Sequence, residues 1–408
     1  MLVAIKESNR FLLSVIWFIL SVFVVGLTKD SDSILVHDML VILTILSYSL
    51  CLYVWIKSGN RWMSLFVFFV FYMMLSNIGQ SLISLFPETS DFLFIYSKFN
   101  IITIIMTLRF QLLCVSSFCC GTSFYLRRKR RILPYNMQLH MMQNVNCSKN
   151  NDNKALYCVF IVSLFYNLID AISFVLLRQN MGYGDAYILR SESGEGGIRL
   201  IMLWITIIIA YKYLFMRKHV KLILTSFVAI CGMYVLCGNR SLIIVFLAIL
   251  AIVYPLLSPD LFRKRYSIIW IVLSLFVFVF LGFISEVRNG DFSDVTKYDT
   301  NASFLLSLAK IFTEMGSAQY PLTITMEAIN LGFPCHQTIL YFIITAFSSS
   351  SICDVLGLAD EYLPLGEWAS SYVGITSYGV GYSCIAEWFM NYGWLGFIFA
   401  FLYGYFIS

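Results

Sequence analysis

Apolar residues form long runs along this chain, and short polar links separate most of these runs. A transmembrane helix needs about 20 consecutive, predominantly apolar residues. Counting the runs that approach this length predicts ten membrane-spanning helices. They lie near residues 11–27, 34–56, 62–86, 100–125, 155–177, 198–215, 222–237, 241–257, 267–284 and 391–407.

The composition supports the same class of protein. Of the 408 residues, 59% are hydrophobic and 12% are charged, whereas soluble domains are about 45–50% apolar and about 25% charged. A soluble globular fold is therefore excluded. We expect an all-α, polytopic integral membrane protein with a single membrane domain over residues 1–408. The first apolar run lacks a small-residue cleavage site, so it is predicted to be the first anchor rather than a cleaved signal peptide.

The basic residues predict the orientation in the membrane. The formal net charge is +5, and Lys and Arg concentrate in every second link, above all in Arg127–Arg131 and Arg263–Arg265. Cytoplasmic links carry this excess in membrane proteins, so both termini are predicted to be cytoplasmic in a bacterial inner membrane. Residues 127–154 are predicted to form a basic cytoplasmic loop that contacts anionic headgroups. The positive charge therefore indicates no nucleic-acid partner.

One long segment between spans, residues 285–387, falls on the periplasmic side. Long loops in compact proteins are usually functional. Residues 304–315 have helical apolar spacing, and the apolar stretch 339–347 is too short to cross a bilayer. We therefore expect a large periplasmic loop with short helices, some at the membrane surface, in reach of a lipid-attached substrate.

Acids and arginines on the periplasmic side are the candidate chemistry. A diphosphate leaving group requires fixed positive charge, and an attacking hydroxyl requires a proton acceptor. The candidate catalytic acids are Glu387 and Glu314, and the candidate substrate-binding arginines are Arg240, Arg288, Arg190 and Arg199. His336 is the alternative base, and no zinc-like ligand spacing accompanies it. No Walker A loop or other cofactor motif occurs, so neither a cofactor nor a metal is expected.

Two charges lie inside predicted spans. Arg109 falls within 100–125 and Asp170 within 155–177, each about 10–12 Å below the outer end of its helix at 1.5 Å per residue. Charges inside a membrane are usually paired. We therefore predict an Arg109–Asp170 ion pair that acts as a structural clamp.

Three stretches resemble the Wzy-type polymerases of O-antigen and capsular polysaccharide repeat units. They are Cys237-Gly238-Asn239-Arg240; Glu314-Met315-Gly316-Ser317-Ala318 with Pro321-Leu322 and Phe333-Pro334; and Gly379-Val380-Gly381-Tyr382-Ser383-Cys384-Ile385-Ala386-Glu387 with Asn391-Tyr392-Gly393-Trp394-Leu395-Gly396. The plan of many spans and one large outer loop near the C-terminus is also similar.

The resemblance implies transfer of a glycan from undecaprenyl diphosphate onto another lipid-linked repeat unit outside the membrane. By analogy, Arg240 and Arg288, with Arg190 or Arg199, would hold the diphosphate, and Glu314 or Glu387 would lie near the acceptor hydroxyl. A chain-length regulator is an additional expected partner. The alternatives are an O-antigen ligase, which would depend on His336, and a flippase or other transporter, for which the expected internal repeats are not found.

Overall fold

The computed structural model describes residues 2–60, 64–86, 94–132, 154–182, 186, 189, 196–215, 219–236, 309, 312–313, 316–332, 369, 372 and 383–408. All regular structure in these residues is helical, which confirms the predicted all-α class. The chain divides into two compact units. Unit 1 comprises residues 1–142 and 312–408, and unit 2 comprises residues 143–311.

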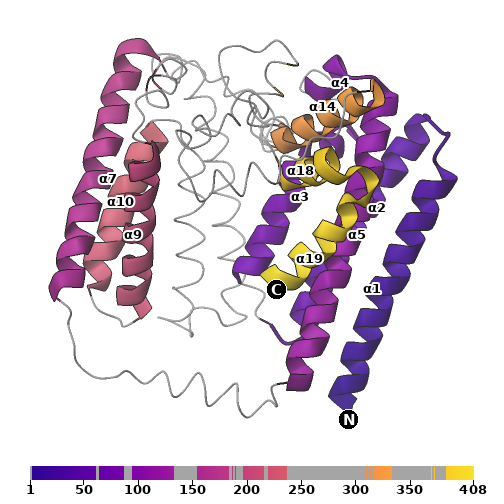
Figure 1. The fold of residues 1–408 in the computed structure, drawn as a ribbon, viewed down its shortest axis with the longest axis horizontal. Helices are drawn as coiled ribbons and strands as arrows, with labels where there is room; N and C mark the ends of the chain where they lie inside the picture. The colour runs from indigo at the N-terminus through magenta and orange to yellow at the C-terminus, as the bar shows by residue number, and fades with distance from the viewer. Residues whose placement is uncertain are drawn as a thin grey trace, which may run out of the picture. The chain divides into compact units, whose positions relative to one another are not determined.

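Unit 1 is built around one long central helix, α5 (Ile101–Ile132). It contains α1 (Leu2–Leu27), α2 (Ile34–Lys57), α3 (Leu65–Ile83), α4 (Phe94–Lys98), α14 (Gln319–Asn330), α18 (Cys384–Tyr392) and α19 (Phe397–Ile407). Helix α5 packs against α1, α2, α14 and α19, and Figure 1 shows the C-terminal α19 alongside it. The first and last parts of the chain therefore share one core.

Helix α5 is buried along most of its length although many of its residues are polar. Two of its hydroxyls donate to carbonyls of the preceding turn: Thr107 Oγ1 to the Thr103 carbonyl at 2.9 Å, and Ser116 Oγ to the Leu112 carbonyl at 2.7 Å. Such bonds let small polar side chains face other helices without an unpaired group. The helix also continues through Ile132. The basic run Arg127–Arg131, which was predicted to open a cytoplasmic loop, is therefore helical, and the rest of that predicted loop up to residue 153 lies outside the described residues.

Glycines allow α5 and α19 to pack with their backbones nearly touching. A Cβ on Gly121 would lie well under 3.0 Å from the Phe401 carbonyl oxygen, and a Cβ on Gly404 would meet the Phe118 carbonyl in the same way. Ser117 Oγ donates to the Phe397 carbonyl at 2.8 Å across this contact. In a membrane, such close van der Waals packing and interhelical hydrogen bonds hold helices together.

The last predicted span is a broken helix. Helix α18 ends at Gly393, whose φ of +56° is left-handed backbone that favours glycine. The 3-10 turn η6 (Gly393–Gly396) then leads into α19. A Cβ on Gly396 would lie 2.7 Å from the Trp388 carbonyl oxygen, so this position also requires glycine. The span covers Cys384–Ile407 and begins earlier than the predicted 391–407.

Part of the predicted periplasmic loop belongs to the core of unit 1. The 3-10 turn η5 (Gly316–Ala318) leads into α14, which packs on α3, α5 and α18. Nearly all of its residues are buried, and they include Gln319, Leu322 and Met326. A Cβ on Gly316 would lie 2.5 Å from the Gln80 backbone nitrogen and 3.0 Å from the Gly79 Cα. This segment therefore contributes to the helical core.

Unit 2 contains α7 (Lys154–Met181), α9 (Gly196–Phe215) and α10 (Val220–Leu236). Helices α7 and α9 are joined by a polar ladder. Asn167 Nδ2 donates to Thr206 Oγ1 at 2.9 Å, and Thr206 Oγ1 donates to Ser163 Oγ at 2.9 Å. Ser163 and Asn167 lie four residues apart and therefore on the same face of α7. The ladder sets the register of α9 on α7.

Six helices in the described part of the chain are long and apolar enough to cross a membrane: Ser8–Leu27, Ile34–Lys57, Phe66–Ile83, Ile101–Lys129, Lys154–Met181 and Cys384–Ile407. They correspond to six of the ten predicted spans. The predicted spans 198–215 and 222–237 fall on α9 and α10, whose apolar parts Ile201–Leu214 and Val220–Ile230 are shorter. The predicted spans 241–257 and 267–284 lie outside the described residues.

Candidate functional site

Glu387 is the predicted catalytic acid whose surroundings the structure describes. It lies in the first turn of α18, where the Ser383 side chain caps the helix by accepting a hydrogen bond from the Ala386 backbone N–H at 3.3 Å. Its side chain is half-buried. The positive end of a helix dipole stabilises a carboxylate in the first turn. The cap and the helix start therefore fix the position of this carboxyl group.

Helix α14 supports α18 from one side. Ile385 and Phe389 of α18 share an apolar cluster with Leu322 and Met326 of α14. Figure 1 shows α14, α18 and the short α4 at the same end of unit 1 as the link between α1 and α2. Glu387 thus belongs to a helix at that end of unit 1, and packing fixes the apolar face of this helix.

A hydrogen-bonded network that the sequence analysis did not predict ties α2, α3 and α4 together at this end. His37 Nδ1 lies 2.8 Å from Asp38 Oδ1, and His37 Nε2 lies 2.5 Å from the Tyr96 hydroxyl. The Tyr96 hydroxyl donates to Ser81 Oγ at 3.0 Å and accepts from Ser84 Oγ at 3.1 Å. Burial, assisted by the charge of Asp38, raises the pKa of Tyr96 to about 12 despite its hydroxyl partners. Tyr96 therefore stays neutral and acts as a structural hub.

Gln319 connects this network to α14. Its Nε2 donates to Ser81 Oγ at 2.6 Å. In the residue before Ser81, Gln80 Nε2 donates to the Thr313 carbonyl at 3.3 Å, and Gln80 Oε1 accepts from the Ile95 backbone N–H at 2.9 Å. Each bond is buried, where a lost partner is costly. The network therefore fixes α14, and with it α18 and Glu387, on the first helices of the chain.

Unit 1 contains a second described acid from the predicted loop, Glu327. Glu327 is on α14, and burial together with the nearby Glu327 charge raises the pKa of Tyr372. Tyr372 packs at the edge of the apolar cluster that contains Tyr320 and Ile324. Two acids and a tyrosine from the predicted periplasmic loop therefore belong to the α14 and α18 end of unit 1.

The structure describes partners of the two intramembrane charges inside their own units, and the predicted Arg109–Asp170 pair, which would join the two units, stays a prediction. Arg109, on α5 in unit 1, donates through Nη2 to the Thr28 carbonyl and, at 2.7 Å, to the Ser31 carbonyl. Asp170, on α7 in unit 2, lies 3.1 Å from Arg199 Nε, measured from Oδ1. Both charges have polar partners, as expected, but depth in a span does not specify which partner. Arg109 clamps the link between α1 and α2.

Arg199 is one of the predicted substrate-binding arginines. It lies in the first turn of α9 and forms the ion pair with Asp170. The other predicted site residues lie outside the described residues: Glu314, Arg240, Arg288, Arg190 and His336. Their roles stay predictions.

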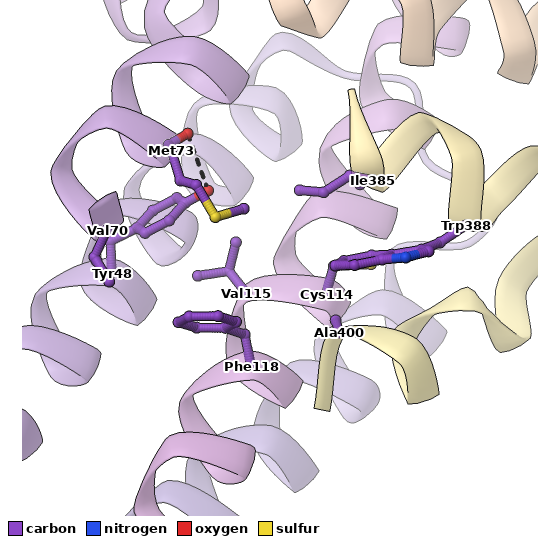
Figure 2. Close-up of a pocket in the computed structure, with 9 residues that line it drawn as sticks. All are labelled: Tyr48, Val70, Met73, Cys114, Val115, Phe118, Ile385, Trp388 and Ala400. Carbon is purple, nitrogen blue, oxygen red and sulfur yellow. Dashed lines mark hydrogen bonds between the residues drawn. The ribbon is translucent and has the colours of Figure 1, made fainter. Parts of the chain in front are cut away.

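The structure offers no metal site in the part that it describes, since no group of three His, Cys, Asp or Glu residues there lies close enough to bind an ion. It does contain a small apolar cavity in unit 1, lined by residues that include Tyr48, Phe118, Ile385 and Trp388. Figure 2 shows the Tyr48 hydroxyl bonded to the Met73 carbonyl at 3.3 Å, beside the apolar side chains that surround the space. The Tyr48 hydroxyl and the Cys114 thiol are the ionisable groups of this lining, and Glu387 does not contribute to it.

These features define the class: a polytopic α-helical membrane protein whose candidate carboxylate is held at one end of a helix bundle. Residues 11–408 match the protein family described as O-antigen polysaccharide polymerase Wzy, and because the match covers nearly the whole chain, the chain belongs to this family. No curated protein and no solved structure matches the chain.

Membership confirms the predicted resemblance and the predicted function, the polymerisation of O-antigen repeat units. It implies a polymerase that transfers glycosyl groups and a lipid-linked oligosaccharide substrate in the membrane. Together with the apolar helices, it indicates a multi-pass membrane protein.

Proposed function

We propose that this protein is a membrane glycosyltransferase that extends a glycan carried on undecaprenyl diphosphate at the periplasmic face of the bacterial inner membrane. The observation that carries the proposal is the position of Glu387: a half-buried carboxylate in the capped first turn of α18. A carboxylate in this position can accept a proton from a sugar hydroxyl that approaches from the end of the bundle.

The distribution of basic side chains supports this orientation. At the other end of unit 1, Arg10 Nη1 donates to Ser58 Oγ at 3.3 Å, and the Arg127 guanidinium lies 5.1 Å from the centre of the Phe11 ring. Lys57 ends α2 beside them. By the positive-inside rule this basic end faces the cytoplasm, so the Glu387 end faces the periplasm. The same rule favours cytoplasmic termini.

The proposed reaction is a displacement at the anomeric carbon of the growing glycan. The acceptor sugar oxygen forms the new glycosidic bond, the bond from the anomeric carbon to the phosphate oxygen breaks, and undecaprenyl diphosphate leaves with the bonding electrons. The acceptor proton passes to Glu387 or Glu314. The charge that develops on the diphosphate is stabilised by arginines, for which Arg240, Arg288, Arg190 and Arg199 are the candidates.

The test is deletion of the gene followed by complementation, with the surface polysaccharide separated on a gel. A strain without the polymerase keeps single capped repeat units and loses the ladder, and the wild-type gene restores the ladder. Glu387→Gln, which removes the proton acceptor and keeps the shape, should fail to restore it while the protein remains in the membrane. Glu327→Gln, a matched change on α14, should restore it. A full ladder with Glu387→Gln would exclude this residue as the base.

The same gel separates the alternative functions. Loss of both the ladder and the single capped units would indicate an O-antigen ligase or a flippase instead of a polymerase. A ligase should further lose activity with His336→Ala. A chain-length regulator is the proposed protein partner, and its removal should change the length distribution of the ladder without abolishing it.

A further inference from the structure

Two consecutive cations of α5 are held by tyrosines where α5 contacts α19. Arg128 Nη1 donates to the Tyr405 hydroxyl of α19 at 2.7 Å, and Lys129 Nζ lies 5.5 Å from the centre of the Tyr125 ring. The rings of Tyr125 and Tyr405 meet edge to face, with their centroids 5.8 Å apart. Hydrogen bonding and cation–π attraction therefore fix two positive charges at this contact. We call these four residues the basic seam.

The basic seam attracts anions. Neither of the two ion pairs in the described residues involves Arg128 or Lys129. Arg128 is exposed and Lys129 is half-buried. Arg127, at the preceding position, adds a third charge, and its guanidinium lies 5.1 Å from the centre of the Phe11 ring of α1. Three consecutive positive charges at one helix end provide a local attraction for a negatively charged group.

The side chains next to the seam are apolar and exposed. Phe124 is 39% exposed, Leu402 is 42% exposed and Phe406 is 77% exposed. The Phe124 and Phe406 rings lie 5.8 and 5.3 Å from the Tyr405 ring, measured between centroids. The apolar span of α5 extends to Lys129, so the cations lie at the level of lipid headgroups and the apolar side chains lie at the level of acyl chains.

We propose that the basic seam is a binding site for an anionic phospholipid, which links α5 to α19. The phosphate contacts Arg128 and Lys129, since charge-assisted hydrogen bonds from these groups are strong, and an acyl chain lies along Phe124 and Phe406. An anionic phospholipid complements both the charged and the apolar part of this surface, whereas a free phosphate complements only the charges. Basic sites between membrane helices bind acidic headgroups in this way. The inference is independent of the role of Glu387.

The alternative is that these cations only orient the protein in the membrane and offset the negative end of the α5 dipole. Any cation at this end of unit 1 would then attract anionic lipid equally. Lys57 provides the matched control, because it is exposed and ends α2. The next residue, Ser58, accepts a hydrogen bond from Arg10 at 3.3 Å, which places the end of α2 beside α1. Lys57→Gln removes the same charge outside the seam.

The experiment uses native mass spectrometry of purified full-length protein to measure the affinity for dioleoylphosphatidylglycerol. A cation near an acidic lipid surface corresponds to about a fivefold change in affinity. We expect Arg128→Gln and Lys129→Gln each to raise Kd about fivefold, and the double variant to raise it about 25-fold. Lys57→Gln should keep the wild-type Kd. Dioleoylphosphatidylcholine, which has no net charge, and inorganic phosphate should each bind about tenfold more weakly or less.

Three results would overturn the inference. The first is equal affinity for the two lipids, and the second is equal weakening by Lys57→Gln and Arg128→Gln. The third is inorganic phosphate that binds as tightly as phosphatidylglycerol, because the apolar side chains would then contribute nothing. If Arg128→Gln does not accumulate in the membrane, Lys129→Gln decides, and a wild-type Kd for that variant overturns the inference.

Discussion

Replacing Gly121 by alanine tests how much the close contact between α5 and α19 contributes to the stability of unit 1. The added Cβ would lie 2.9 Å from the Phe401 carbonyl carbon, 3.0 Å from the Tyr405 nitrogen and still closer to the Phe401 oxygen. Non-bonded heavy atoms prefer separations of about 3.5–4.0 Å. Helix α19 would therefore have to move away from α5 by about 1 Å.

A displacement of this size has two calculable consequences. The hydrogen bond from Ser117 Oγ to the Phe397 carbonyl, now 2.8 Å, would lengthen to about 3.8 Å, beyond hydrogen-bonding range. The bond from Thr122 Oγ1 to the Gly404 carbonyl, now 3.3 Å, would be lost with it. Each such bond is worth about 1 kcal/mol, and a gap of 0.5–1 Å forfeits about a quarter to a half of each dispersion contact. We expect the free energy of unfolding to fall by about 3 kcal/mol.

Thermal unfolding of the purified protein in detergent measures this effect. A loss of 3 kcal/mol should lower Tm by about 6–12 °C for a unit of this size. Gly26→Ala is the matched control, because a Cβ on Gly26 of α1 meets nothing within 4 Å. Its Tm should stay the same or rise slightly, since alanine favours helix by up to about 1 kcal/mol. If the two variants had the same Tm, the argument from backbone proximity would be refuted.

Two further predictions concern the other end of unit 1. Arg109→Met should lower the free energy of unfolding by about 2 kcal/mol, because the Thr28 and Ser31 carbonyls lose their buried donor. Chemical denaturation in detergent measures this loss. An unchanged denaturation midpoint would contradict the role of Arg109 in holding the link between α1 and α2. Tyr96 has a pKa raised from 10.0 to about 12 by burial, so its stabilising contribution is complete below pH 10 and is lost as the pH rises toward 12, at up to about 1.4 kcal/mol per pH unit. Tm measured across this range should fall more steeply for wild type than for Tyr96→Phe, and parallel curves would contradict the buried position of the phenol.

The class of fold and several spans follow directly from the sequence. A continuous apolar run of about 20 residues is stable in a bilayer as an α-helix, because the helix satisfies its backbone hydrogen bonds within the segment. Helix α14 could not be predicted in the same way. Its 12 residues are too few to cross, and they include threonines, a glutamine and a glutamate, so the pattern indicates a solvated loop. Its burial depends on α3 and α5, with Thr323 Oγ1 donating to the Gln319 carbonyl at 3.0 Å to satisfy the hydroxyl internally.

The candidate site was partly predictable. The position of Glu387 before the last long apolar run predicts a catalytic acid there, and the structure places Glu387 in a capped first turn. The partners of Arg109 were not predictable, since the sequence gives depth in the membrane but not the neighbouring helix. The network around Tyr96 was missed because its members are common residues on three separate helices. A histidine followed by an aspartate near the start of α2 was the available signal.

The arrangement of unit 1 has a consequence for biogenesis. Helix α5 ends at residue 132, and its partner α19 begins at residue 397. At about 5–20 residues per second, the ribosome needs on the order of 10–50 s to synthesise the intervening chain. During this interval the Gly121 surface of α5 faces lipid or an insertion chaperone rather than its final neighbour. Nascent chains arrested before residue 397 should therefore be degraded faster than the finished protein.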